Sequence, residues 1–234
     1  MAEFLSLLVR MNLAAGAAIL LVLVLRRPVR RMFGAQTAYT LWMLPLLAAA
    51  ACLAPARVAP DEGPALASGA VSLVTDAVIQ ADGGWLAAVA AAWLAGVVAS
   101  FAFVALVQFR FLRQARAGIA GPAVVGFVLP RMVTPRDYEA RFTPEERQVV
   151  RAHERAHIDR QDPRANALMA VLQGLNWFNP LVHVAAVNLR LDQELACDAM
   201  VMDRFPRMRR RYAETLLKTQ LSPRALPLGC HWGP

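Results

Sequence analysis

Two histidines and a glutamate stand close together in the segment His153-Glu154-Arg155-Ala156-His157. If this segment is helical, positions i and i+4 share one face, so both imidazoles can reach one metal ion. Glu154 is next to His153 but points in another direction, which suits a general base that contacts water. This HExxH pattern is a known signature of zinc peptidases. A surface helix with two histidines is the alternative, but the chain has only four histidines in all.

A catalytic zinc site takes a third protein ligand and keeps one position open. Glu194 and Asp198 lie four residues apart on a predicted helix, so they share a face. One carboxylate can bind the metal while the other accepts a hydrogen bond from a ligating histidine. Alone, such a pair indicates only a solvated acidic face; downstream of HExxH it predicts the missing ligand. His183 and Tyr212 are weaker candidates for stabilising an oxyanion, because histidines and tyrosines are more often structural.

A capping box predicts the start of the helix that carries HExxH. Thr143 is followed by Pro144 at the first helical position and by Glu146 three residues after the cap. The helix should continue to about Arg160. This prediction puts both histidines on regular helix, as a shared metal site requires.

Two Asx-Pro dipeptides divide the next part of the chain. Asp162-Pro163 starts one helix, with Asp162 interpreted as its cap, and Asn179-Pro180 starts a longer one. Residues 166–187 contain no Asp, Glu, Lys or Arg and could be taken for a membrane span. If they crossed, a later carboxylate could not share a metal with the histidines through ~30 Å of hydrocarbon. We therefore predict a helical hairpin, bent at Asn179-Pro180, that packs on or dips into the membrane.

Short apolar runs bounded by Gly and Pro precede these helices. Residues 122–130 and 131–134 predict two short strands, which could pair as a hairpin. An extended substrate backbone could pair with the strand near Val124–Val128 by strand addition.

The chain as a whole is too apolar for a typical soluble domain. Apolar residues make up 57% of the sequence and the mean hydropathy is +0.40. Three segments reach the ~20 residues needed to cross a bilayer, at about 4–25, 36–54 and 85–109. No basic region precedes the first, which indicates a retained membrane helix rather than a signal peptide.

Arginines set the expected orientation. Four of them fall within residues 26–31, between the first two segments, and three more follow the third segment at 110–116. The loop at 55–84 is acidic. The positive-inside rule then puts the N-terminus outside and the chain after the third segment in the cytoplasm. The net charge of +8 suits nucleic acid or the anionic inner leaflet, and this topology favours the leaflet, so no direct nucleic-acid partner is expected.

The sequence resembles the BlaR/MecR-type antirepressor membrane metallopeptidases in three motifs that follow one another in order. These are HERAH, the run from Asn176 to Pro180 and the run from Asp192 to Asp198. The resemblance covers about residues 1–220. It implies a mainly α membrane protein with three transmembrane helices and a small α+β zincin-like (gluzincin) peptidase domain. The implied divisions are a transmembrane region at 1–118, a cytoplasmic peptidase domain at 119–220 and a tail at 221–234.

The same resemblance implies roles for single residues. Zinc would be bound by His153, His157 and Glu194, with Glu154 as catalytic base and Asp198 hydrogen-bonded behind a ligand. The implied function is a zinc endopeptidase of the bacterial inner membrane that cleaves a cytoplasmic protein in signal transduction. A winged-helix transcriptional repressor is the expected substrate, and membrane lipids and a second copy of the chain are further expected partners.

Sensory members of that family continue through a fourth membrane helix into an extracellular penicillin-binding domain, whereas this chain ends at Pro234. A beta-lactam sensor role is therefore not expected. Two alternatives stay open: an HtpX-like quality-control protease, which shares HExxH and a downstream ExxxD, and a non-catalytic membrane signalling protein. The intact HExxH disfavours the second alternative.

Overall fold

The computed structural model describes residues 2–54, 83–220 and 230–231. Three helices make up its first half: α1 (Ala2–Thr40), α2 (Leu44–Ala51), which follows a 3₁₀ turn at Leu41–Met43, and α4 (Gly83–Arg116). The second half is mixed α and β. Its elements are β1 (Ala123–Val125), β2 (Arg131–Val133), α5 (Tyr138–Arg141), α6 (Pro144–Asp159), α7 (Asp162–Leu175), α8 (Pro180–Arg204), a 3₁₀ turn at Pro206–Met208, α9 (Arg209–Gln220) and β3 (Cys230–His231).

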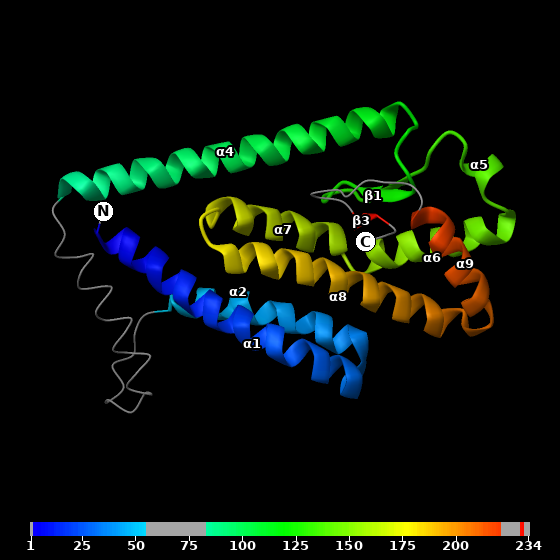
Figure 1. The fold of residues 1–234 in the computed structure, drawn as a ribbon, viewed down its shortest axis with the longest axis horizontal. Helices are drawn as coiled ribbons and strands as arrows, with labels where there is room; N and C mark the ends of the chain where they lie inside the picture. The colour runs from blue at the N-terminus through cyan, green and yellow to red at the C-terminus, as the bar shows by residue number, and fades with distance from the viewer. Residues whose placement is uncertain (1, 55–82, 221–229, 232–234) are drawn as a thin grey trace.

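The α7–α8 hairpin lies between two layers of long helices. Figure 1 shows α4 along one side of the hairpin and α1 with α2 along the other, while the sheet, α6 and α9 gather at one end. The break between α7 and α8 falls where the sequence predicted it, and the Asn179 side chain accepts a hydrogen bond from the Leu181 amide, 3.0 Å away. The hairpin predicted for residues 166–187 is therefore confirmed.

The chain reverses direction within its first apolar region. Gly34 has φ 88° and ψ 169°, outside the helical range, and the two arms on either side of it pack against each other (Figure 1). A positive φ is easy for glycine, which has no Cβ to clash with the backbone. The helix before this turn extends well past residue 25, where the predicted first membrane segment ends. The arginines at 26–31 end the apolar segment, but they do not end the helix.

Two helical stretches are long and apolar enough to cross a membrane, Glu3–Ala51, which contains the turn at Gly34, and Gly84–Arg116. Only 17% and 6% of their most apolar windows are buried within the molecule. Core helices of a soluble protein would be covered by other elements, whereas here large apolar side chains such as Val98 and Phe103 point outward, 61% and 67% exposed. These outer surfaces are suited to contact with lipid tails.

Small residues join α4 to the hairpin. The Trp177 ring fills the space above Gly96, where an added Cβ would lie 2.1 Å from ring carbon, and Phe101 packs over Gly174 in the same way. The Trp177 indole donates to the Trp93 carbonyl at 3.2 Å. The small residue Gly96 thus lets α4 pack closely against the tip of the α7–α8 hairpin.

The strands form one small antiparallel sheet in the order β2-β1-β3. Val124 pairs with Met132 on one side and with Cys230 on the other. The two predicted strands are confirmed, but the hypothesis of substrate pairing along Val124–Val128 needs correction. The strand ends at Val125, and its second edge is already paired with residues 230–231 of the same chain.

A buried ion pair connects the first helix to α8. Arg26 Nε lies 2.9 Å from Asp192 Oδ2, with 7% and 1% of the two side chains exposed, and the Trp42 indole donates to the same carboxylate at 2.9 Å. Apolar side chains of α1 and α8, including Ile19 and Leu189, pack around these groups. The helix that carries Glu194 is therefore fixed to the apolar region of the chain two residues before that glutamate.

Candidate metal centre

The HExxH helix is well formed and buried on one face. The Thr143 hydroxyl accepts from the Glu146 amide at 3.3 Å, and the Glu146 carboxylate accepts from the Thr143 amide at 2.8 Å. This is the predicted capping box, and it satisfies amides that the first helical turn would leave free. His153 and His157 follow on the buried face, both with no exposed surface.

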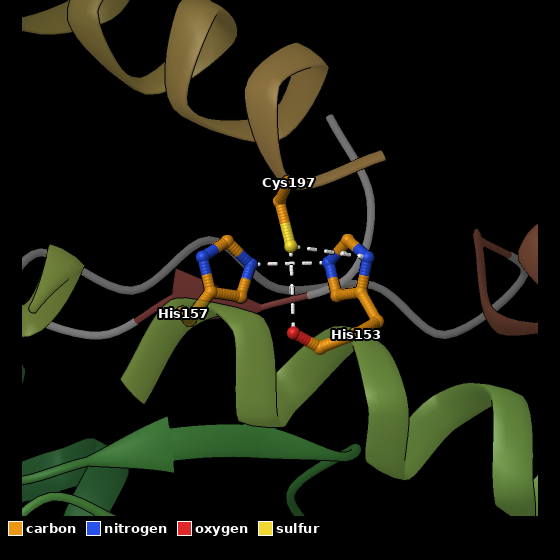
Figure 2. A group of neighbouring side chains, drawn as sticks. All are labelled: His153, His157 and Cys197. Atoms are coloured by element: carbon orange, nitrogen blue, oxygen red, sulfur yellow. Dashed lines mark hydrogen bonds between the residues drawn. The ribbon is translucent and has the colours of Figure 1, made fainter. Parts of the chain in front are cut away.

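Three predicted site residues converge at their tips. The Nε2 atoms of His153 and His157 are 3.0 Å apart (Figure 2), and the Glu194 carboxylate lies 3.4 Å from the first and 3.7 Å from the second. Ligands held at ~2.0–2.1 Å around a tetrahedral zinc ion are separated by about 3.3 Å. The spacing of these atoms therefore matches what one such ion requires.

The second nitrogen of each histidine faces an oxygen. His157 Nδ1 lies 2.8 Å from Asp162 Oδ2, and His153 Nδ1 lies 2.7 Å from the Tyr212 hydroxyl oxygen. The Tyr212 hydroxyl in turn donates to Asp198. Because the Tyr212 proton is used there, His153 Nδ1 must be the donor in its own contact with Tyr212.

These contacts decide which nitrogens face the centre of the site. With their Nδ1 protons donated, His153 and His157 turn the lone pairs of both Nε2 atoms toward each other at 3.0 Å. Two facing lone pairs repel unless a proton or a cation lies between them. Burial lowers the pKa of His153 to about 4, against the opposing charges of Asp198 and Asp162, so a shared proton is disfavoured. A cation fits this arrangement best.

The Glu154 carboxylate is fully buried and has no hydrogen-bond partner among the described residues. Neither of its oxygens accepts a hydrogen bond from any residue that the structure describes. Burial, with a smaller effect from the charge of Glu194, raises the pKa of Glu154 well above its usual range. An isolated buried carboxylate is costly, so a group beyond the described residues is needed to satisfy it. Water next to a metal ion would supply both a donor and positive charge.

Glu194 has an environment suited to a ligand. Its side chain keeps 27% of its surface exposed, on the open side of the centre. Burial raises the pKa of Glu194 to about 7; His157 lowers it, and Asp198 and Asp162 raise it further. A cation held between this carboxylate and the imidazoles would favour its charged form.

Asp162 supports the centre in a way that the sequence did not reveal. It was interpreted as a helix cap, but the residue at the cap of α7 is Gln161, with φ 62°, and the Asp162 side chain forms no cap. Its carboxylate instead accepts from His157 and from the Tyr39 hydroxyl at 3.2 Å. Arg160 Nε is 3.3 Å from the same group. The place of Asp162 in the sequence could not distinguish a helix cap from a hydrogen-bond partner of His157. Both roles put an Asp just after the helix that carries HExxH.

Cys197 is a second residue that the sequence left out. Its sulfur can join the two histidines in a metal-binding group, since one ligand atom of each lies within 4.8 Å of the others (Figure 2). The thiol, however, donates to the His153 carbonyl at 3.4 Å and lies 3.6 Å from His153 Nδ1, the nitrogen already bonded to Tyr212. Burial raises the pKa of the Cys197 thiol above its usual range, which disfavours the thiolate that binds metals.

His183 lies outside the centre. It is at the start of α8, 11 positions before Glu194, or about 16 Å at ~1.5 Å per residue. It is exposed, and its ring nitrogens contact Gln173 at 3.2 Å and the Trp177 carbonyl at 3.0 Å. Its contacts stabilise the turn of the hairpin, so the suggestion of an oxyanion role gains no support.

Comparison with known proteins places this centre in a family. The profile of the BlaR1 peptidase M56 family matches residues 6–118 and 112–233, which together cover most of the chain. The chain belongs to this family of BlaR/MecR-type membrane metallopeptidases.

Curated relatives match a shorter part. The regulatory protein BlaR1 of Bacillus licheniformis is 30% identical over 101 residues, 43% of this chain and 17% of that protein. The methicillin resistance protein MecR1 of Staphylococcus aureus is 28% identical over 106 residues, 45% of this chain and 18% of its own, and that of Staphylococcus epidermidis matches equally. The matched part thus spans less than a fifth of each relative.

Proposed function

We propose that this chain is a zinc endopeptidase embedded in the bacterial inner membrane, which cleaves a cytoplasmic transcriptional repressor in signal transduction. The observation that carries the proposal is the fully buried Glu154, whose carboxylate accepts no hydrogen bond from the described residues, beside two imidazoles whose Nε2 atoms face each other at 3.0 Å. Membership of a peptidase family agrees with hydrolysis as the reaction.

His153, His157 and Glu194 are the proposed zinc ligands. Two nitrogens and one carboxylate oxygen are a donor set that suits zinc and leaves one position open for reactants. Glu194 is preferred over Cys197 because its oxygens face both Nε2 atoms. Asp198, through Tyr212, and Asp162 hold the two rings in the orientation that presents these nitrogens.

The proposed reaction is hydrolysis of a peptide bond. When bound, zinc would polarise the substrate carbonyl and make water more acidic. Glu154 takes a proton from the attacking water as the water oxygen bonds to the carbonyl carbon. As the C–N bond breaks, Glu154 returns that proton to the leaving amine. Its raised pKa lets the carboxylate hold the proton between these two steps.

The proposed topology has three membrane crossings, two in the bent stretch Glu3–Ala51 and one in Gly84–Arg116. The arginines at 26–31 and 110–116 would then face the cytoplasm, with the N-terminus outside. The proposed divisions are membrane region 1–118, peptidase domain 119–220 and tail 221–234. On this topology the centre opens at the inner surface of the membrane, where a soluble repressor can reach it.

The names of the relatives support a role in regulation. One is named a regulatory protein and others are named for methicillin resistance, which associates these proteins with controlled responses. We extend this role to the chain as cleavage of a winged-helix repressor, with lipids and a second copy of the chain as further partners.

The test uses the full chain purified in lipid nanodiscs, with zinc measured by mass spectrometry and a winged-helix repressor encoded beside the gene as substrate. Glu154→Gln should retain zinc and lose about 10²–10⁴-fold of the cleavage rate, because it removes only the proton acceptor. Glu145→Gln, on the exposed face of the same helix, is the matched control and should cleave normally. Wild-type protein without zinc, or equal cleavage by Glu154→Gln, would refute the proposal.

A further inference from the structure

A large cavity lies between the first helices and the α7–α8 hairpin, separate from the metal centre. Its volume is about 760 Å³, and its walls come from α1, α2, α7 and α8, with Trp93 of α4 at one end. It follows α1 from Phe4 to Ile19, a rise of about 22 Å at ~1.5 Å per residue. One leaflet of a bilayer has about 15 Å of hydrocarbon, so the cavity has the length of an extended acyl chain.

The two ends of the cavity differ in chemistry. Most of its wall is apolar, with side chains such as Leu8, Leu46 and Leu172. Arg160, Gln161 and Arg164 close the end nearest the metal centre. A ligand that satisfies both parts must have a long apolar chain and an anionic or strongly polar head.

The two arginines at the polar end of the cavity are able to bind an anionic head group. The Arg160 side chain is 7% exposed, and its Nη2 atom has no hydrogen-bond partner among the residues described, although Nε pairs with Asp162. Arg164 contacts the Phe127 carbonyl at 3.3 Å and Gln161 at 3.0 Å. No acidic side chain in the described parts of the chain forms an ion pair with Arg164. A buried donor and an uncompensated cation together favour an anion.

The geometry points to a binding site for an anionic phospholipid, with one acyl chain in the cavity and the phosphate at Arg160 and Arg164. A free phosphate would leave the apolar wall without contact. The inference depends on the chain lying in a membrane and not on its being a peptidase.

The site has a short connection to the metal centre. Arg160 Nε lies 3.3 Å from Asp162 Oδ2, and the same oxygen is 2.8 Å from His157 Nδ1. A lipid phosphate bound to Arg160 would therefore lie three contacts from a proposed zinc ligand, through Arg160 and Asp162. Lipid composition would in this way bear on the orientation of the His157 ring.

Trp42 provides a probe for the acyl chain. It lines the cavity but is only 5% exposed, so bulk lipid cannot reach it. The full chain in nanodiscs of phosphatidylcholine is titrated with phosphatidylglycerol carrying brominated acyl chains, and the Trp42 signal is obtained by subtracting a Trp42→Phe variant. We expect saturable quenching at low mole fraction, and no such saturation with brominated phosphatidylcholine.

Two matched pairs of variants test the apolar part and the charge. Ala15→Phe fills the cavity and should abolish quenching of Trp42, whereas Ala17→Phe, on the exposed side of α1, should not. Arg164→Ala should weaken phosphatidylglycerol binding about tenfold, as loss of a charged hydrogen bond predicts, and Arg113→Ala on α4 should leave it unchanged.

Native mass spectrometry of the same proteins is the second measurement. It should detect one phosphatidylglycerol retained by wild type and by Glu154→Gln, because binding does not need catalysis. Equal affinity for phosphatidylcholine, or normal binding by both Ala15→Phe and Arg164→Ala, would overturn the inference while leaving the peptidase proposal intact. Exclusion of brominated lipid by a transmembrane peptide would also overturn it and assign the cavity to a protein segment.

Discussion

At the scale of single residues, the centre depends on the groups behind its histidines as much as on the histidines themselves. Tyr212 is the clearest case, since its hydroxyl accepts from His153 Nδ1 and donates to Asp198. Burial, followed by the charge of Asp198, raises the pKa of Tyr212 above its usual range, so this hydroxyl keeps its proton. The tautomer of His153 follows from that proton.

We therefore predict that Tyr212→Phe weakens zinc binding by about 10–100-fold, because the ring of His153 loses its oriented acceptor. Competition with a fluorescent chelator measures the affinity. Tyr138→Phe removes a hydroxyl from the same apolar cluster, where it donates to the Arg147 carbonyl at 3.4 Å, and serves as control. If both variants bind zinc like wild type, the Tyr212 hydroxyl does not orient His153.

At the scale of helices, the hairpin α7–α8 is held against α4 by aromatic side chains that pack over glycines of the opposite element. Gly96 of α4 receives the Trp177 ring, and Gly174 of α7 receives Phe101. Pairs of this kind let two backbones approach closely, which is a main source of helix association in membranes.

Replacing Gly96 by Leu should displace Trp177 and destabilise the protein by about 1–3 kcal/mol, the usual cost of overpacking. Thermal unfolding in detergent, followed by intrinsic fluorescence, measures the change. Ala95→Leu lies beside it on the exposed side of α4 and should have little effect. Adding Trp177→Ala to Gly96→Leu should recover part of the lost stability. If stability does not recover, the destabilisation does not come from the clash with Trp177.

At the scale of the whole molecule, the apolar helices and the peptidase part are joined through a buried charge. Asp192 of α8 pairs with Arg26 at 2.9 Å, lies 3.5 Å from Arg30 and accepts from the Trp42 indole. Glu194 follows within one helical turn. A displacement of α1 would therefore move the helix that carries a proposed zinc ligand.

Removing one partner of the Arg26–Asp192 pair should lower the free energy of unfolding far more than removing both. Arg26→Leu leaves Asp192 buried beside a weaker partner and should cost about 3–5 kcal/mol, whereas Arg26→Leu with Asp192→Leu should recover most of it. Thermal unfolding and zinc content, measured on the single and double variants, give the comparison. Arg27→Leu, exposed one position away, is the control. Equal losses in the single and double variants would contradict a role for charge pairing.

Local signals in the sequence were sufficient for most elements. The capping box at Thr143 and the Asn179-Pro180 break predicted where α6 and α8 begin, because caps and prolines act on the adjacent backbone. The spacing of HExxH placed two histidines on one face for the same reason. The family resemblance, drawn from motifs in order, was confirmed by the family profile.

Only the tertiary structure decided which distant groups meet. Asp162, Tyr212 and Cys197 surround the two histidines, yet each lies on a different helix from them, and nothing in local spacing predicts such contacts. The cavity ending at Arg160 and the pairing of β3 with β1 depend likewise on segments far apart in the chain. Backbone geometry within a few residues is fixed by local sterics and hydrogen bonds, whereas contacts between helices depend on the packing of the whole molecule.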